Sequence, residues 1–555
     1  MLLLSVAAAA APSREMPSDA GPWVVQASYA HERSLNLLLR RAAPWKVDRR
    51  ARTLIVEVPT RFEYQQLLNE GFAVEVDARL TRAMYAPLER QPDQISGIAG
   101  YPCYRTVDES YARASRLAAR FANLVEIIDI GDSWEKLNLA SGGSDLRVVK
   151  LTNRALAGPK PKLFVQAALH AREYATSETL TRFMERLVQG YGTDADVSWI
   201  LDTHEIHLLL VANPDGRRFA ELPASRSQRK NRNANHCPSG DTLLGVDLNR
   251  NFPFDWGGLG SSGEDCNLNF RGIARLSEPE NISISNYLST IFPDQRNEQP
   301  IPAVDLTSPV SLDASGLFID LHAPASAVWW PWGNVDGQLA PNALELQTLG
   351  RKLAYYNGYF PAQSNEGGAI AGASDDFVFA TLGVASYTIE MGGDGFFPDC
   401  KSFEAELVEQ NLAALMFAAR VPRAPYRLPS GPEVIDISAP SNSLSSGRAR
   451  IDITADDRRL SFVNGSEPLQ VIESANAYLT PPWQPSATPI ASFVFSDGQA
   501  DSITEPMHAL IAISALNPGR QLVYLQARDA LGHLGPVSAL WLTRGENPIF
   551  ADGFE

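Results

Sequence analysis

A histidine and a glutamate stand three residues apart in the stretch LFVQAALHAREYATSETL, as His170 and Glu173. An apolar, strand-like run precedes them, and a helical pattern follows. At this spacing, across a strand-to-helix turn, both side chains can converge on one metal ion. Taken alone, the pattern favours a capped helix start with a surface histidine. A zinc site needs at least three protein ligands and an open position for water, so a further ligand must come from elsewhere in the chain.

A second candidate histidine, His322, follows the apolar run SGLFIDLH in the same context as His170. The carboxyl ends of strands in an open α/β sheet are where ligand sites form, so these two histidines are expected to be neighbours. His204 and His207 alternate along another apolar run. They are too close for the metal-binding His-Glu-x-x-His helix motif, and we interpret them as structural.

An acidic residue, Glu390, ends the apolar run VASYTIEMG. A carboxylate at the end of a buried strand is costly unless it has a function or a partner. Beside a zinc ion it could accept a proton from water, whose pKa the metal lowers. A structural salt bridge is the alternative interpretation.

The stretch SQRKNRNANHCPSGDTLLGVDLNRNFPFDWGG is rich in Arg and Asn, although the chain as a whole is acidic. Asn249 and Arg250 follow the apolar LLGVDL, which we predict to be a strand. An Arg fork beside an amide suits a carboxylate. Arg229 and Arg172 are further cations that could face an oxyanion, and a solvated basic loop is the alternative for Arg229.

Together these motifs carry a resemblance to a known family. HARE, RKNR, VDLNRNF, FIDLH and SYTIE occur in the order found in zinc metallocarboxypeptidases of the carboxypeptidase A/B family. Residues of about 101–425 resemble the catalytic domain of that family. The resemblance implies Zn²⁺ as the cofactor, and as its ligands His170, Glu173 and His322.

The same resemblance implies roles for the remaining residues. Glu390 would be the general base and then the general acid, and Arg229 would polarise the scissile carbonyl. The substrate's terminal carboxylate would be bound by Asn249 and Arg250, with Arg172 as an accessory group.

The segment GASDDFVFA resembles the lining of the family's pocket for the C-terminal side chain. In the basic-specific branch an acid lies at the pocket floor, and here Asp375 would pair with a substrate Lys or Arg. Ser-Asp-Asp is also a good helix start, which is the alternative. The sequence departs from the family at one point, because Gly368 stands where a mobile tyrosine is usual.

The expected fold class is α/β. Apolar runs such as LVEIIDIG, DLRVVKLT and KLFVQAAL alternate with helical segments, which indicates a sheet covered by helices on both faces. The resemblance implies a mixed, mostly eight-stranded sheet. Residues 22–95 are expected to form a small α+β domain and a linker, which resemble a pro-segment by position and size. Short alternating runs predict a β-sandwich over 430–545.

The N-terminal residues and the cysteines indicate where the protein is located. Residues 1–21 are predicted to be a signal peptide, which indicates a secreted or periplasmic protein, and 546–555 form a terminal tail. The four cysteines predict two disulfides in such a protein, with buried thiols as the alternative. By resemblance Cys237 pairs with Cys266, which leaves Cys103 for Cys400.

The expected partners are peptide or protein C-termini. The net charge of −16 argues against a nucleic-acid binder, which needs a basic face. No later segment is apolar over the length of a transmembrane helix. The sequence does not indicate an oligomeric state.

The predicted function is a secreted zinc carboxypeptidase, with a preference for C-terminal Lys or Arg as a further hypothesis. One alternative is a zinc amidase or peptidase acting on cell-wall peptides. Another is an inactive binding protein with an enzyme-like domain, which the missing tyrosine and the β-sandwich would suit.

Overall fold

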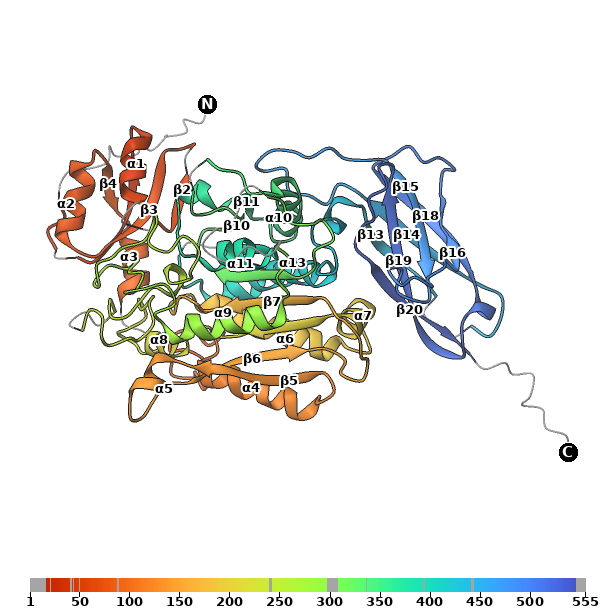
Figure 1. The fold of residues 1–555 in the computed structure, drawn as a ribbon, viewed down its shortest axis with the longest axis horizontal. Helices are drawn as coiled ribbons and strands as arrows, with labels where there is room; N and C mark the ends of the chain where they lie inside the picture. Colours follow the sequence, from red (N-terminus) through yellow and green to blue (C-terminus); the bar gives the residue numbers. More distant parts are fainter. Residues whose placement is uncertain are drawn as a thin grey trace, which may run out of the picture.

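The structure is a computed structural model that describes residues 16–545, apart from 20, 40, 41, 43, 49, 87–88, 239–241, 297–307, 336, 393–394 and 441–443. Most of the predicted signal peptide and the terminal tail lie outside the described residues. The described strands form a small N-terminal sheet, a large central sheet and two C-terminal sheets (Figure 1). None of the described helices is long and apolar enough to cross a membrane.

The central sheet has eight strands in the order β11-β10-β12-β9-β7-β8-β6-β5. Its middle pairs, β12–β9, β9–β7 and β7–β8, are parallel, and antiparallel strands complete both sides. The strands are β5 (Val125–Asp132), β6 (Asp145–Leu151), β7 (Lys162–Ala167), β8 (Glu205–Leu209), β9 (Leu317–His322), β10 (Ala327–Trp330), β11 (Phe360–Gln363) and β12 (Ala385–Glu390). The mixed eight-stranded α/β fold is confirmed.

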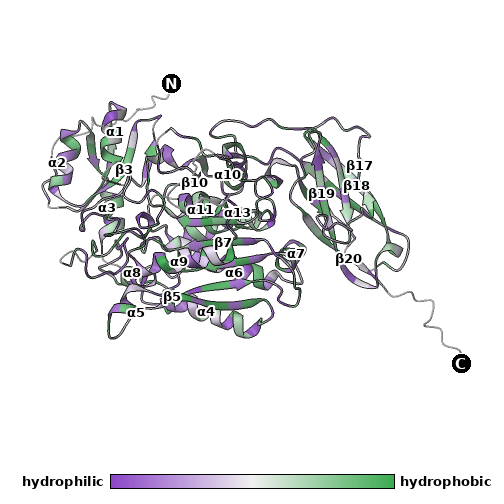
Figure 2. Ribbon diagram, viewed as in Figure 1, coloured by the Kyte–Doolittle hydropathy of each residue, from purple (hydrophilic) through white to green (hydrophobic). Residues whose placement is uncertain are grey.

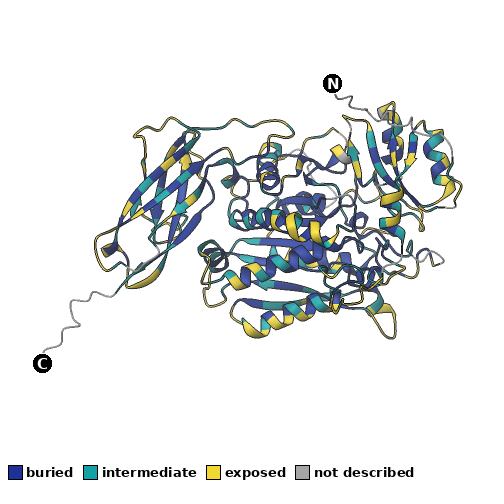
Figure 3. Cartoon of the chain, turned by 180° about the vertical axis from the view of Figure 1, so that it is seen from behind, coloured by how far each residue is buried: buried dark blue, intermediate teal, exposed yellow. Residues whose placement is uncertain are grey.

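Helices cover both faces of this sheet because its central strands are apolar on both sides (Figures 2 and 3). In β7, Leu163 and Val165 join one core cluster and Phe164 joins the other. The first face packs against α4 (Val107–Arg120), α6 (Tyr174–Gly190), α7 (Ala195–Thr203), α10 (Ala343–Asn357) and α13 (Val408–Arg420). The second packs against α9 (Pro279–Ile291) and α11 (Ser374–Leu382). Shorter helices are α5 (Trp134–Asn138), α8 (Pro214–Ala220) and α12 (Cys400–Ser402).

The N-terminal unit is an antiparallel sheet of order β2-β3-β1-β4 with helices packed on it. Its elements are β1 (Trp23–Ser28), α1 (Glu32–Leu39), β2 (Lys46–Asp48), β3 (Thr53–Val58), α2 (Arg61–Asn69), β4 (Ala73–Val76) and α3 (Ala78–Tyr85). The apolar-alternating run FAVEVDARL forms a strand only in its first half. Asp77 accepts a hydrogen bond from the Leu80 N–H (2.8 Å) and so begins α3.

The C-terminal unit is a sandwich of two four-stranded sheets. One sheet contains β13 (Glu433–Ser438), β14 (Arg448–Asp456), β18 (Thr504–Ala512) and β17 (Val494–Phe495). The other contains β16 (Ala491–Ser492), β15 (Ile472–Tyr478), β19 (Gly519–Asp529) and β20 (Ser538–Arg544). The sandwich is tied to the helices of the central unit by the buried Glu433, whose carboxylate lies 3.2 Å from Lys352 Nζ and 3.5 Å from Arg420 Nη1.

Both expected disulfides are present, Cys103–Cys400 and Cys237–Cys266. The first joins the segment before α4 to the start of α12, across 297 residues of sequence. The second closes the Arg/Asn-rich segment into a loop. The alternative of buried free thiols is therefore wrong.

Candidate active site and metal centre

Three neighbouring parallel strands place the candidate residues at one edge of the central sheet. β12, β9 and β7 are adjacent, and their carboxyl ends point the same way. His322 is the last residue of β9, and Glu390, the last of β12, is its register partner. His170 follows the end of β7 at Ala167 and precedes α6. The three residues therefore lie together at this edge, as expected from their positions after apolar runs.

His170, Glu173 and His322 present ligand atoms to a common point. His170 Nδ1 lies 2.8 Å from Glu173 Oε1 and 3.0 Å from His322 Nδ1, which is 3.1 Å from Glu173 Oε2. All three side chains are at most 5% exposed. Burial alone would raise the pKa of Glu173, but the two histidines hold it below its usual range. Two imidazole nitrogens and one carboxylate, with room for further ligands, are a donor set typical of catalytic zinc.

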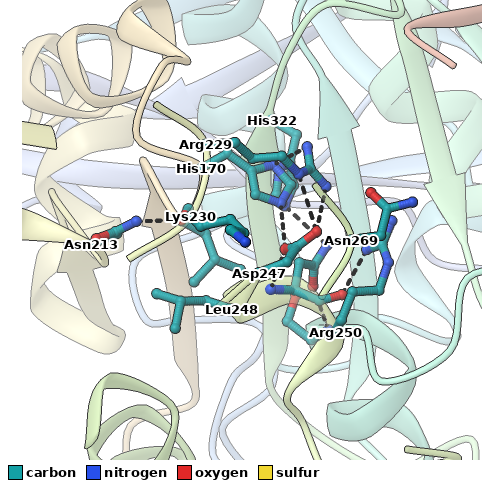
Figure 4. Close-up of polar contacts among 12 residues, drawn as sticks. His170, Asn213, Arg229, Lys230, Asp247, Leu248, Arg250, Asn269 and His322 are labelled. Atoms are coloured by element: carbon teal, nitrogen blue, oxygen red, sulfur yellow. Dashed lines mark hydrogen bonds and ion pairs between the residues drawn. The ribbon is translucent and has the colours of Figure 1, made fainter. Parts of the chain in front are cut away.

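Each histidine is oriented from behind by an aspartate, and Figure 4 shows the contact of Asp247 with His170. His170 Nε2 lies 3.2 Å from Asp247 Oδ1, and His322 Nε2 lies 3.1 Å from Asp320 Oδ2. A carboxylate on the far nitrogen fixes the ring and its tautomer, so the lone pair of Nδ1 faces the metal position. The sequence reasoning missed both aspartates. Asp320 could have been found from alternation, because it lies two residues before His322 on the same strand.

The segment around Asn249 and Arg250 differs from the sequence prediction, because LLGVDL is not a strand. Its backbone bonds go to other loops: Asn231 N–H donates to Val246 O (3.0 Å) and Asp247 N–H to Phe270 O (2.8 Å). Leu248–Arg250 form a 3₁₀ turn, η1, which Asp247 caps by accepting from Asn249 N–H. An apolar run can therefore be buried without a strand partner when neighbouring loops satisfy its backbone.

Arg229 and Arg250 approach the centre from this loop region (Figure 4). Arg229 donates through Nε (3.0 Å) and Nη2 (2.9 Å) to Asp247 Oδ2, while its Nη1 lies 3.3 Å from His170 Nδ1. Arg250 donates to the carbonyls of Gly260 (2.8 Å) and Asn249 (2.7 Å). Burial lowers the pKa of Arg250 to about 10, so the guanidinium remains charged at neutral pH.

A cavity next to the metal position is lined by residues from all these segments. His170, Glu173, Arg229, Asn249, Arg250, Asp375 and Glu390 all line it. Desolvation raises the pKa of Glu390 to about 7. A group with such a pKa can both accept and donate a proton near neutral pH.

The two acids of GASDDFVFA have different surroundings, although both lie in the first turn of α11. Asp376 accepts hydrogen bonds from the backbone N–H groups of Gly333 (3.0 Å) and Asn334 (2.9 Å), so it holds a loop. Asp375 lines the cavity and accepts from Thr388 Oγ1 (3.1 Å). Gly368 also lines the cavity, and within the described part of the chain no tyrosine does.

The remaining histidines considered from the sequence are held elsewhere. His204 Nδ1 lies 2.9 Å from Thr203 Oγ1, and His207 Nδ1 lies 2.8 Å from Tyr287 O–H. Neither lines the cavity beside the metal position. Arg172 does line it, but its guanidinium is engaged by Glu57 of the N-terminal unit at 2.6 Å.

The chain belongs to the zinc carboxypeptidase family, whose sequence profile matches residues 110–413, more than half of the chain. A zinc carboxypeptidase of Saccharothrix mutabilis subsp. capreolus is 27% identical over 54% of this chain and 65% of its own length. Carboxypeptidase A2 of Rattus norvegicus is 30% identical over 39% of this chain and 48% of its own. The chain thus matches less than two thirds of the length of these relatives.

A solved structure supports the fold. The crystal structure of carboxypeptidase A from Helicoverpa armigera superposes with a TM-score of 0.57 at 23% identity, over 73% of this chain and 98% of that one. The protein is therefore a member of the metallocarboxypeptidase class in fold and in sequence family.

The aspartate behind His170 yields a first prediction. Asp247→Asn weakens the acceptor of His170 Nε2 and removes the charge that balances Arg229, so zinc affinity should fall about 10- to 100-fold. Competition with a chelator on metal-depleted protein measures this. Asp265→Asn, which removes a half-exposed carboxylate beside His236, is the control and should bind zinc as the wild type does. Equal affinities in all three proteins would contradict the orienting role.

Proposed function

We propose that the protein is a zinc-dependent carboxypeptidase that hydrolyses the last peptide bond of peptides or proteins. The observation that carries the proposal is the convergence of His170, Glu173 and His322 at the strand edge where Glu390 and Arg250 also lie. These three ligands would hold zinc, which supplies a Lewis acid and lowers the pKa of water.

The other side chains suit the remaining tasks of the reaction. Arg250 and Asn249 would bind the free carboxylate of the substrate and so place its last carbonyl beside the metal position. Arg229, whose Nη1 already faces that position, would donate to the carbonyl oxygen as negative charge develops there. Glu390 would take a proton from the attacking water and transfer it to the leaving amine.

Glu390→Gln tests this function. The variant keeps the shape of the side chain but cannot accept a proton, so kcat should fall by about 10²- to 10⁴-fold or more. Bound zinc, measured by elemental analysis, should stay at the wild-type level. Unimpaired turnover by the variant would refute the role of Glu390.

A further substrate, the same peptide with an amidated C-terminus, separates the alternatives in the same assay. Amidation of the substrate's C-terminus should abolish hydrolysis, because it removes the carboxylate that Arg250 would bind. An amidase would keep its activity on that substrate, and an inactive binding protein would hydrolyse neither peptide.

We further propose that the pocket prefers a basic C-terminal residue. Asp375 is 2% exposed, lines the cavity, and has no ion pair with a cation among the residues that the structure describes. Burial raises the pKa of this carboxyl group. A substrate ammonium or guanidinium would provide the missing counter-charge.

A panel of peptides that differ only in the last residue tests this preference. The wild type should cleave C-terminal Lys or Arg faster than Leu, and Asp375→Ala should reduce kcat/KM for the basic residues by about 100-fold. The Leu peptide serves as the control within each protein, since its cleavage needs no counter-charge. Equal preference for Leu and Lys in the wild type would end the basic-pocket hypothesis.

We also propose that the N-terminal unit is a pro-segment that blocks the site. Leu39, Ala42, Pro44 and Trp45 of this unit line the cavity beside the metal position. The remaining cavity volume is about 80 Å³, far below the 300–1,000 Å³ typical of ligand pockets.

Contacts between the two units support this covering role. Glu57 Oε2 lies 2.6 Å from Arg172 Nη1, and Trp45 packs edge-on against Phe396 at 4.6 Å between ring centroids. Leu39 occupies the space beside Gly368, where a Cβ atom would lie 2.6 Å from Leu39 Cδ1. Glu57 of the N-terminal unit therefore pairs with Arg172, which is expected to help bind the substrate's carboxylate.

Cleavage near the linker LERQPDQ, residues 88–94, followed by removal of the N-terminal unit, should raise kcat/KM at least tenfold, because it reopens the cavity. In the uncut chain, Glu57→Gln should also raise kcat/KM, since Arg172 loses its ion-pair partner. Glu75→Gln, a charge removal at an exposed position of the same sheet, should leave activity unchanged. Equal activity before and after the cut would refute the pro-segment.

The two disulfides are typical of proteins from oxidising compartments. A secreted or periplasmic location stays a prediction.

A further inference from the structure

A second cavity, of about 840 Å³, is lined by residues of both the central unit and the C-terminal sandwich. None of the proposed zinc ligands lines it, and Glu390 does not. Arg423 comes from the segment after α13, and Asp457 and Trp483 come from the sandwich, which stands beside α13 and α10 (Figure 1). The volume lies within the range typical of small-molecule sites.

Among the arginines that line this cavity, Arg423 is the one that forms no ion pair with a described residue. Two other arginines line the same cavity, and both are paired: Arg420 with Glu433 (3.5 Å) and Arg427 with Asp313 (3.0 Å). Arg423 stacks over the ring of Trp483 at 4.3 Å, and its buried Nε has no hydrogen-bond acceptor. Among the described residues no carboxylate forms an ion pair with it. Leaving a buried N–H donor without an acceptor is costly, so a ligand that offers an acceptor to Arg423 Nε would be favoured.

The sandwich contributes an acidic residue to the cavity, Asp457. Asp457 is 4% exposed, and its carboxylate accepts a hydrogen bond from Gln470 N–H at 2.6 Å. In the described part of the chain no cation forms an ion pair with it. Lys352, whose charge acts on Asp457, is bound to Glu433 instead. Among the described residues, the cavity thus has a cation from the central unit and an anion from the sandwich that form no ion pair, either with each other or with another group.

Apolar side chains complete the lining. Leu460 and Trp483 line the cavity, together with four leucines that are each at least 38% exposed: Leu312, Leu344, Leu531 and Leu534. Partly exposed leucines around a cavity offer contacts to apolar groups of a ligand. A ligand with one charge would leave one wall unpaired, and a single amino acid would fill only a small part of the volume.

We propose that this cavity binds a short peptide of a few residues with both termini free. Its C-terminal carboxylate would meet Arg423, its N-terminal ammonium would meet Asp457, and apolar side chains would contact the leucines. The site is separate from the proposed catalytic centre, where the substrate's carboxylate would meet Arg250.

The probe is the tripeptide Leu-Leu-Leu, titrated calorimetrically into the zinc-loaded full-length Glu390→Gln protein, in which turnover is suppressed. We expect a binding event that Arg423→Gln and Asp457→Asn each weaken about tenfold, because each removes one charged contact. Arg427→Gln is the matched control: this arginine lines the same cavity but is exposed and paired with Asp313. It should leave the affinity unchanged.

Chemical variants of the probe distinguish the cavity from the catalytic centre. N-acetylation removes the ammonium and should weaken the event that depends on Arg423, whereas binding that depends on Arg250 needs only the carboxylate. Hydrogen exchange in the presence of the peptide should show protection of residues 420–428 and 482–484. Arg423→Gln and Asp457→Asn in the otherwise wild-type enzyme should keep their kcat for a C-terminal substrate, which shows that they fold.

Two results would overturn the proposal. One is tripeptide binding of the same affinity in the Glu390→Gln protein and in the same protein carrying Arg423→Gln or Asp457→Asn. The other is binding that is lost only in Arg250→Gln, with no protection of residues 420–428, since the peptide would then occupy the catalytic centre alone.

Discussion

The parallel pairing of β7, β9 and β12 is the constraint on which the rest of the site depends. Because side-by-side parallel strands end at the same edge, residues far apart in the chain meet there: His322 Nδ1 lies 3.1 Å from Glu173 Oε2 across a sequence separation of 149. Helices on both faces bury these strands. The edge is therefore rigid, and it holds the three ligand atoms within 4.8 Å of one another.

Burying three ionisable groups at one point requires hydrogen-bond or charge partners for the groups themselves. Asp247 shows how one residue serves several of these needs. It accepts from His170 and from Arg229, and it caps the turn that carries Asn249. The loop around it has little regular structure, so side chains replace the ladder bonds of a sheet. Asn231 and Asn233, for example, donate to the buried Glu278 at 2.8 and 2.9 Å.

The two flanking units use charge in different ways. The N-terminal unit reaches the catalytic edge with Glu57, which pairs with Arg172, and with apolar side chains that occupy the cavity. The sandwich is joined through Glu433, a carboxylate with no solvent exposure that is surrounded by Lys352, Arg420 and Tyr356. Truncating one member of such a buried network is strongly destabilising. Arg423 and Asp457 contrast with this network, because they line the cavity in the same interface and form no ion pair with any residue that the structure describes.

The sequence by itself determined which residue types stand at the ends of buried strands and in what order. The positions of three residues could be predicted because each ends or follows an apolar run that indicates a buried element: His170, His322 and Glu390. The central strands lie where such runs occur. β10 and β11 were missed because they are short and their pattern is weak. LLGVDL was predicted wrongly, because an apolar run does not reveal whether its backbone pairs with a strand or with loops.

Only the tertiary structure decided which groups face one another. Asp375 and Asp376 are adjacent in the sequence, yet one lines the cavity and the other binds two backbone N–H groups. Arg172 lies between two proposed ligands in the sequence, yet its partner is Glu57 of another unit. Periodicity assigns a residue to an element and a face, but its partner depends on how distant segments pack, and that packing is set by the whole core.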